Sequence, residues 1–212
     1  MQTNSSARAT AETKRERGGR LPPGQVLTHR FPALHYGHVP SFDEQTWDLR
    51  VFGEVEKERR WSWEEFCRLP RTRVTMDIHC VTTWSKFDTE WEGVSLRELA
   101  DVALVRPKPG ATTMVQHCEL GYTTNVPLEV ALGDNFLLAT HFGGEPLTPE
   151  HGFPLRAVCG AIPNRDDLED VYFWKGGKWL RGLEFLADDE PGFWERSGYH
   201  NRGRVWEQER FS

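Results

Sequence analysis

Helix-forming and strand-forming runs are both short in this sequence, and they follow one another without an internal repeat. Two stretches open with the Ser-x-x-Glu pattern of a capping box, at Ser62 and Glu65 and again at Ser95 and Glu98. In this pattern the serine oxygen and the glutamate carboxylate accept from free N–H groups at the start of a helix, so a short helix is predicted after each serine. Mixed with strands, such helices predict one α+β domain and not a doubly wound sheet.

The other runs of the chain are mostly strand-like. The segment 73–81, "RVTMDIHCV", is predicted to be a strand that delivers Cys80 at its end. Pro127 is predicted to start a short helix over 127–133. The next segment, 134–142, is apolar and fits a strand or a helix equally well. Further strands are predicted over 46–55, 112–120, 155–162 and 178–189, and the segment 191–212 has no regular period.

The size and composition of the chain restrict its class. Its 212 residues, 38% of them hydrophobic, suffice for a core without disulfide or metal crosslinks. No apolar run is long enough to span a membrane, and the net charge of −6 does not suggest nucleic-acid binding. Residues 1–24 are polar and lack the apolar segment of a secretory signal. We therefore expect a disordered tail over 1–24, a folded domain over 25–212, and a cytoplasmic protein.

The four cysteines are spread along the chain, with no CxxC motif among them. A disulfide framework is not expected in a large cytosolic domain. The doublets His79-Cys80 and His117-Cys118 raise the alternative of a zinc site. Neighbouring residues on a strand point to opposite faces, however, so each doublet offers at most one ligand. A lone cysteine is by default a small buried hydrophobe, and this alternative also stays open for Cys80.

No nucleotide-binding or serine-hydrolase motif occurs, but five segments together resemble a known family. They are "DIHCVTTWSKFDTEWEGVSLREL", "GYTTNVPLE", "GEPLTPEHGFPLR", "GGKWLRGLEF" and "PGFWERSGYH", in this order. They resemble the sulfite-oxidase-type molybdenum-cofactor domain, from about residue 31 to the C-terminus. The resemblance implies the fold of that domain and an oxidoreductase that carries molybdenum with molybdopterin.

The resemblance also implies roles for individual residues. Cys80 matches the cysteine that binds the metal, and a thiolate is the soft ligand that such a centre needs. His151, Arg156 and Lys178 match the residues that hold the phosphate and the pterin. Tyr199 matches a tyrosine beside the metal, where a phenol can donate a hydrogen bond and help to move a proton.

His35 and Tyr36 match an early pterin-contacting loop more loosely, and a packed aromatic loop is an alternative for them. Without the resemblance, Arg156 and Lys178 would be read as solvated surface charges, and Tyr199 as an aromatic side chain at the rim of a loop.

The sequence departs from sulfite oxidases at the substrate site. Arginines that bind sulfite are absent from the early loop, which has "AL" before His35, and from the run after the cysteine, which has "WSK". Lys86 of that run does not replace the fork of an arginine. Sulfite is therefore a doubtful substrate, and the chain looks closer to stand-alone bacterial members such as methionine-sulfoxide reductase catalytic subunits. A further departure is the acidic insert at 159–170, which could be a lid, a partner site or, by default, a surface loop. Its carboxylates should point outward, because they would repel a phosphate.

Two functions remain as hypotheses. The first is a molybdopterin-dependent oxidoreductase that transfers an oxygen atom or an electron pair on a small molecule. The chain has no haem or iron–sulfur motif, so this enzyme would need an external electron-transfer partner. The second is a non-catalytic module that binds a pterin or a partner on the same fold. The presence of every matched residue favours the enzyme.

Overall fold

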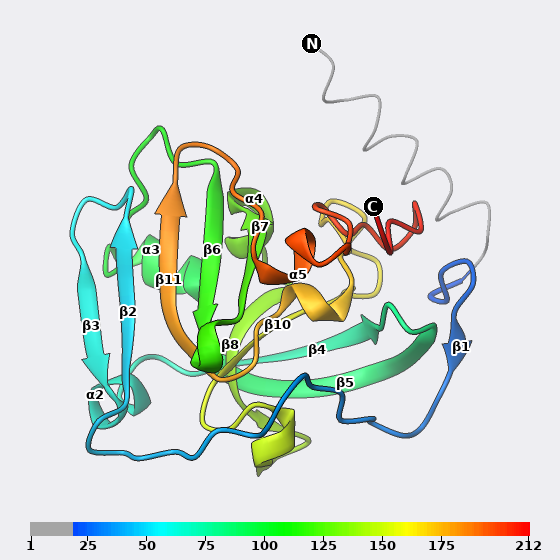
Figure 1. Ribbon diagram of the computed structural model, residues 1–212, viewed down its shortest axis with the longest axis horizontal. Coiled ribbons are helices and arrows are strands. Elements are labelled where there is room, and N and C mark those ends of the chain that lie inside the picture. The colour runs from blue at the N-terminus through cyan, green and yellow to red at the C-terminus, as the bar shows by residue number, and fades with distance from the viewer. Residues whose placement is uncertain (1–18) are drawn as a thin grey trace.

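Two β-sheets form the framework of the structure, a computed structural model that describes residues 19–212 (Figure 1). The first sheet has the strand order β3-β2-β11-β6-β7, in which β2 and β11 are parallel and the other neighbours antiparallel. Its strands are β2 (Asp48–Gly53), β3 (Arg59–Ser62), β6 (Thr113–Cys118), β7 (Thr123–Pro127) and β11 (Leu180–Leu186).

The second sheet has the order β1-β5-β8-β10, and β4 and β9 extend it by pairing with β5 and β8. The long strand β5 forms an antiparallel hairpin with β4, and residues 80–83 make the turn between them. The strands of this sheet are β1 (Val26–Leu27), β4 (Thr72–His79), β5 (Trp84–Val94), β8 (Phe136–Phe142), β9 (Glu145–Pro146) and β10 (Arg156–Cys159).

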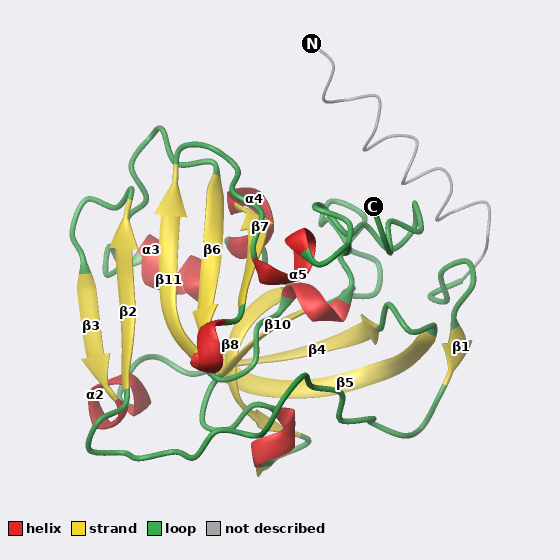
Figure 2. Ribbon diagram, viewed as in Figure 1, coloured by secondary structure: helices red, strands yellow, loops and turns green. Residues whose placement is uncertain are grey.

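The helices of the described residues are all short (Figure 2). The first predicted capping box is confirmed, because both of its hydrogen bonds start helix α2 (Trp63–Cys67). The second is only half formed at helix α3 (Leu96–Asp101), since the Glu98 carboxylate accepts from the Thr72 hydroxyl instead. The other helices are α4 (Leu128–Ala131), α5 (Phe193–Arg196) and the 3₁₀ turns η1 (Glu119–Gly121), η2 (Pro149–His151) and η3 (Phe173–Lys175).

The main core lies between the two sheets, and a second apolar cluster covers the other face of β8. Leu138 belongs to the main core, whereas Leu137 and Ala139 belong to the second cluster. A strand buried on both faces shows no polar alternation, which explains why 134–142 was ambiguous in the sequence. It is strand β8. The α+β fold class predicted from the sequence is confirmed, as are the predicted strands at β2, β4, β6, β10 and β11.

The two ends of the described chain meet beside the β4–β5 turn (Figure 1). An Arg210 nitrogen donates to the carbonyl of Gly24, and Arg20 forms an ion pair with the buried Asp77 carboxylate at 2.6 Å. Residues 1–18 of the predicted tail lie outside the described residues. In residues 19–212, no helix is long and apolar enough to cross a membrane.

Candidate functional site: a cleft beside Cys80

A cleft of about 790 Å³, a volume that includes open solvent at its mouth, lies beside the β4–β5 turn. Loop 31–36, the Cys80 turn, η2, η3 and the facing ends of β6 and β7 form its walls. Six residues that the sequence singled out line it together: His35, Tyr36, Cys80, His151, Arg156 and Lys178. The seventh, Tyr199, does not line the cleft but packs against the apolar cluster that contains Cys80.

Cys80 lies one residue after β4, where the sequence predicted it, and only 8% of its surface is exposed. Its N–H donates to the carbonyl of Trp84, and its own carbonyl accepts from the N–H of Thr83. Thr83 adopts a positive φ of 76°, which lets the chain reverse within these few residues. The hairpin therefore presents the thiol at the cleft on a tight and well-bonded turn.

Both ends of the described chain hold this turn from outside. Three of its carbonyl groups accept hydrogen bonds from residues more than fifty positions away in the sequence. The bonds run from Gln25 Nε2 to Cys80 (3.1 Å), from Val26 N to Thr83 (2.8 Å) and from Arg210 Nη1 to Val81 (2.6 Å). The turn is thereby fixed by tertiary contacts as well as by its own hydrogen bonds.

The surroundings of the Cys80 thiol are largely aromatic. Tyr172 belongs to its buried cluster, and Trp84, Trp174 and Tyr199 pack against that cluster. The Tyr199 ring meets the Trp174 ring edge-on at 4.9 Å. Burial and, to a lesser degree, the nearby Cys80 raise the pKa of the Tyr199 phenol, so it is protonated and able to donate at neutral pH.

Arg156 is a buried cation without a carboxylate partner among residues 19–212. It is 2% exposed, and its guanidinium donates to the carbonyls of His151 (3.1 Å) and Gly176 (3.3 Å). Its charged group also lies 4.2 Å over the Phe173 ring. Burial lowers the pKa of Arg156 to about 10, which reflects the cost of holding this charge away from water. An anion in the cleft would relieve that cost.

Lys178 is the second cation of the cleft. Its Nζ donates to the carbonyls of Leu34 and Glu150, each at 2.7 Å. Burial and then the positive Arg156 lower the pKa of Lys178 to about 7. Gly152, with φ of 108°, lets η2 approach both cations, because a Cβ there would lie 3.0 Å from the Cβ of Arg156 and 3.2 Å from that of Lys178. Two cations close together, neither in an ion pair with a carboxylate among residues 19–212, form a site suited to a phosphate.

His151 lies in the cleft wall with both ring nitrogens engaged. Its Nε2 faces the carbonyl of Phe31 at 3.2 Å, and its Nδ1 faces the Thr148 hydroxyl at 2.8 Å. Because a carbonyl only accepts, Nε2 carries the proton and Nδ1 accepts from the hydroxyl. Burial lowers the pKa of His151, and its ring stacks on Phe31 at 4.2 Å. His151 therefore acts here as a neutral wall that fixes the early loop.

The early loop contributes His35 and Tyr36 to the outer part of the cleft. His35 Nδ1 contacts the carbonyl of Gly37, and its ring meets Trp179 edge-on at 5.9 Å. Tyr36 is 64% exposed, and its carbonyl accepts from the Tyr122 hydroxyl at 2.9 Å. These contacts hold the loop over the cleft and leave the Tyr36 phenol open to solvent.

Sequence reasoning missed three side chains that matter for the cleft. The indole N–H groups of Trp84 and Trp174, both cleft-lining residues, are buried and have no hydrogen-bond partner among the described residues. Cys118 also lines the cleft, opposite Gly177, where a Cβ would lie only 2.5 Å from its sulfur. Burial raises the pKa of the Cys118 thiol to about 12, so it stays protonated. No spacing rule identifies the two tryptophans, and the sequence singled out Cys118 only as a possible zinc ligand beside His117, with no role in the cleft.

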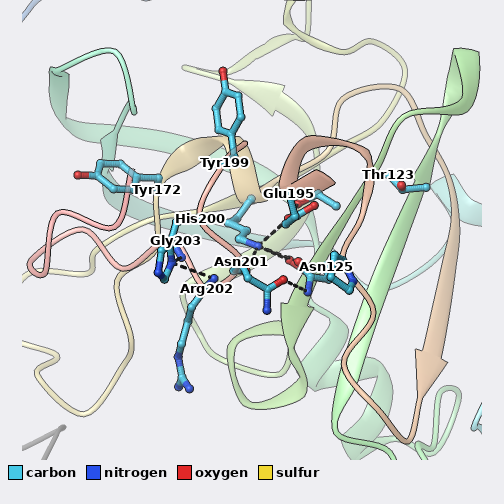
Figure 3. A network of polar contacts seen from close by, with 12 residues as sticks. Thr123, Asn125, Tyr172, Glu195, Tyr199, His200, Asn201, Arg202 and Gly203 are labelled. Atoms are coloured by element: carbon cyan, nitrogen blue, oxygen red, sulfur yellow. Dashed lines mark hydrogen bonds and ion pairs between the residues drawn. The ribbon is translucent and has the colours of Figure 1, made fainter. Parts of the chain in front are cut away.

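Lys175, the other lysine of "WKGGKW", is also missed by sequence reasoning and lies under the cleft floor. Its fully buried Nζ contacts Glu195 (2.7 Å), the Asn125 side chain (2.8 Å) and the Asn125 and Asn201 carbonyls. Asn125, Glu195 and Asn201 converge here from β7, α5 and the C-terminal segment, and the Tyr199 hydroxyl turns away (Figure 3). Lys175 thus joins β7 and α5, which border the cleft, to the C-terminal segment.

The acidic insert 159–170 contributes no residue to the cleft lining. Asp167 pairs with Arg165, and Glu169 pairs with Arg202 at 2.6 Å. The expectation that its carboxylates point outward is wrong for Asp170, which is buried and accepts from the Trp206 indole at 2.8 Å. In the part of the chain that the structure describes, no group of three or more His, Cys, Asp or Glu side chains could hold a metal ion.

Comparison with known proteins now adds to this geometry. Residues 36–194 match the family described as oxidoreductase molybdopterin binding domain. The chain belongs to this family. The match covers the whole cleft except its first wall residues, and the chain is accordingly a molybdopterin-binding oxidoreductase by family.

Three relatives show the range of the family. The chain is 46% identical to "Uncharacterized oxidoreductase YuiH" of Bacillus subtilis, over 93% of this chain and 94% of that protein. It is 27% identical to the protein-methionine-sulfoxide reductase catalytic subunit MsrP of Gluconobacter oxydans, over 90% of this chain and 68% of that protein. It is 24% identical to the sulfite oxidase of Arabidopsis thaliana, over 80% of this chain and 49% of that protein.

The fold is similar to that of a solved structure. It is the sulfane dehydrogenase SoxCD from Paracoccus pantotrophus, with a TM-score of 0.62 and 23% identity. The similarity covers 81% of this chain and 47% of that chain, and it shows that the two-sheet fold is the one found there.

Proposed function

We propose that this protein is a molybdenum-cofactor-dependent oxidoreductase that transfers an oxygen atom or two electrons on a small molecule, with Cys80 as the protein ligand of the metal. The observation that carries the proposal is the composition of one cleft. It holds a thiol on a fixed turn at one wall. Another wall holds the buried Arg156 and the partly buried Lys178, neither of which has a carboxylate partner among the described residues.

The donor set supports this cofactor. A thiolate suits a soft metal centre, and the cations Arg156 and Lys178 suit a phosphate. The unpartnered indole N–H groups of Trp84 and Trp174 provide donors for polar atoms of a bound ligand. When bound, the group supplies a metal that can change oxidation state by two electrons.

The residues of the chain would divide the remaining tasks. Cys80 would fix the metal end of the cofactor, and Arg156 with Lys178 would fix the phosphate end. The aromatic cluster around Cys80 limits the access of water. Tyr199, which is protonated at neutral pH, would donate a proton or a hydrogen bond to a substrate beside Cys80.

The substrate is proposed to be a small molecule other than sulfite. The apolar Leu34 lines the cleft in the loop where sulfite oxidases carry an arginine. Lys86 of the "WSK" run is not among the lining residues, and its Nζ donates to the carbonyl of His29 at 2.9 Å. Arg156 is the one arginine among the described residues that line the cleft, and it is assigned to the phosphate, so an oxyanion would find no further guanidinium in that lining. Electrons would pass to or from an external partner.

A non-catalytic binding module on the same fold is the second candidate. It would retain the phosphate end of the cleft, but it would not need a thiol on a fixed turn. The presence of both ends in one cleft supports the enzyme over the module.

The test is elemental and pterin analysis of protein from a molybdenum-replete host. We expect about one molybdenum and one molybdopterin per chain in the wild type. Cys80→Ser should lose the metal and keep most of the pterin. Cys118→Ser is the matched control, because Cys118 lines the same cleft. Zinc without pterin, or loss of molybdenum in Cys118→Ser and not in Cys80→Ser, would contradict the proposal.

A further inference from the structure

The side chain of Thr82 contacts the sulfur of Cys80, although Thr82 does not line the cleft and the resemblance gives it no role. Its hydroxyl oxygen lies 3.1 Å from the sulfur of Cys80, and no other side-chain hydrogen bond of this hydroxyl occurs among the described residues. Thr82 is exposed, so burial does not explain a polar side chain folded back onto its neighbour's sulfur.

We propose that Thr82 is a positioning residue for the metal site, and that its hydroxyl donates to the Cys80 thiolate and raises the reduction potential of the metal bound there. This inference rests on the proposed function, since it needs a metal on Cys80.

The direction of the hydrogen bond follows from the chemistry of the ligand. In a free thiol either atom could be the donor. A metal-bound thiolate has no hydrogen, so the sulfur can only accept and the threonine hydroxyl must donate. Hydrogen bonds to coordinating sulfur atoms withdraw electron density from them, and they are among the factors that set the potential of metal–thiolate centres.

The rigidity of the turn makes the contact effective. The carbonyls of the residues on either side of Thr82 accept from Arg210 and Val26, and Cys80 itself is bonded to Trp84. The backbone between the sulfur and the hydroxyl therefore cannot relax freely, and the hydroxyl is held at the sulfur before any ligand binds. A hydroxyl on a mobile loop would be lost to water.

The neighbouring Thr83 provides a matched control. It is also exposed, and the structure gives its hydroxyl no contact with the Cys80 sulfur. Thr82→Val and Thr83→Val make the same change, loss of a hydroxyl at constant shape, one residue apart. Thr82→Ser keeps the hydroxyl and removes only the methyl group.

The experiment measures three properties of the loaded, full-length protein and its variants: molybdenum content, the absorption band of sulfur-to-metal charge transfer, and the midpoint potential by redox titration. We expect Thr82→Val to keep its molybdenum, to shift the band to longer wavelength, and to favour the oxidised state about tenfold. A tenfold change corresponds to about 30 mV for a two-electron couple. Thr82→Ser and Thr83→Val should both behave like the wild type.

Several results would overturn the inference. They are an unchanged band and potential in loaded Thr82→Val, an equal shift in Thr83→Val, or a failure of Thr82→Ser to restore the wild-type values. Thr82→Ala gives the same readout if valine crowds the cofactor. If both hydroxyl-free variants stay empty while Thr82→Ser loads, the hydroxyl acts in cofactor insertion and the inference is wrong. An empty wild-type protein would instead overturn the proposed function.

Discussion

The buried ion pair under the cleft floor gives the sharpest prediction about stability. The Lys175 side chain is fully buried, and its Glu195 partner is 2% exposed. One Glu195 oxygen accepts from Lys175 and from the Thr124 hydroxyl, while the other has no partner among the described residues. Lys175→Met would leave this carboxylate charged, buried and without its cation.

The cost can be derived from these contacts. Removing one partner of a buried pair costs about 3–5 kcal/mol, because the remaining charge is uncompensated. A protein of this size loses about 2–4 °C in Tm per kcal/mol, so Tm should fall by roughly 6–20 °C. The double variant Lys175→Met/Glu195→Gln removes both charges, and it should be clearly less destabilised than the sum of the two single variants.

The assay is urea unfolding of cofactor-free protein, followed by tryptophan fluorescence and circular dichroism. Arg68→Met is the matched control, because Arg68 pairs with Glu64 on the surface of α2, where both side chains are about 70% exposed. Such a pair contributes at most about 1 kcal/mol. The reasoning is refuted if Lys175→Met costs no more than Arg68→Met, or if the single-variant costs simply add in the double variant.

Three further predictions concern the cleft. Arg156→Met and Lys178→Met should each weaken retention of the pterin by roughly ten- to hundred-fold, because each lost charge-assisted hydrogen bond costs about 1.5–3 kcal/mol. The control is Arg106→Met, since Arg106 is exposed. Full pterin content in the double variant would argue against the phosphate anchor. In cofactor-free protein the pKa of Lys178 is lowered to about 7, so between pH 7 and about 10.5 the unfolded state binds more protons than the folded state. The contribution of Lys178 to the free energy of unfolding should therefore rise with pH in this window. Urea melts of the wild type and of Lys178→Met should show this rise in the wild type relative to the variant. Sulfite should be a poor substrate, and a micromolar KM in steady-state sulfite oxidation would contradict the absence of a free guanidinium beside Cys80.

The elements that the sequence predicted well are those set by near neighbours. The capping box of α2 joins Ser62 to Glu65, three residues apart, and it formed as predicted. The position of Cys80 after a strand followed equally from the local pattern of 73–81. Where tertiary contacts compete, the local pattern failed in part. The Glu98 carboxylate in helix α3 accepts from Thr72 on strand β4 and does not close its capping box.

The candidate site was predicted less completely, and the two lysines of "WKGGKW" show why. They are three residues apart and chemically alike, and the motif selected Lys178. Only the packing of β7 and α5 against η3 places Lys175 under the floor, while Lys178 lines the cleft. Likewise, Asp170 looked like a surface carboxylate until the C-terminal segment brought Trp206 over it.

The sequence alone therefore determined the α+β fold class and the main strands, and through the resemblance it singled out six of the residues that line the cleft. The tertiary structure alone decided how they meet, because the decisive contacts join distant segments. His151 reaches Phe31 across 120 positions, Arg210 reaches Val81 across 129, and Lys178 reaches Leu34 across 144. No local pattern encodes such contacts. They form because the two sheets bury their apolar faces against each other and so bring these segments side by side.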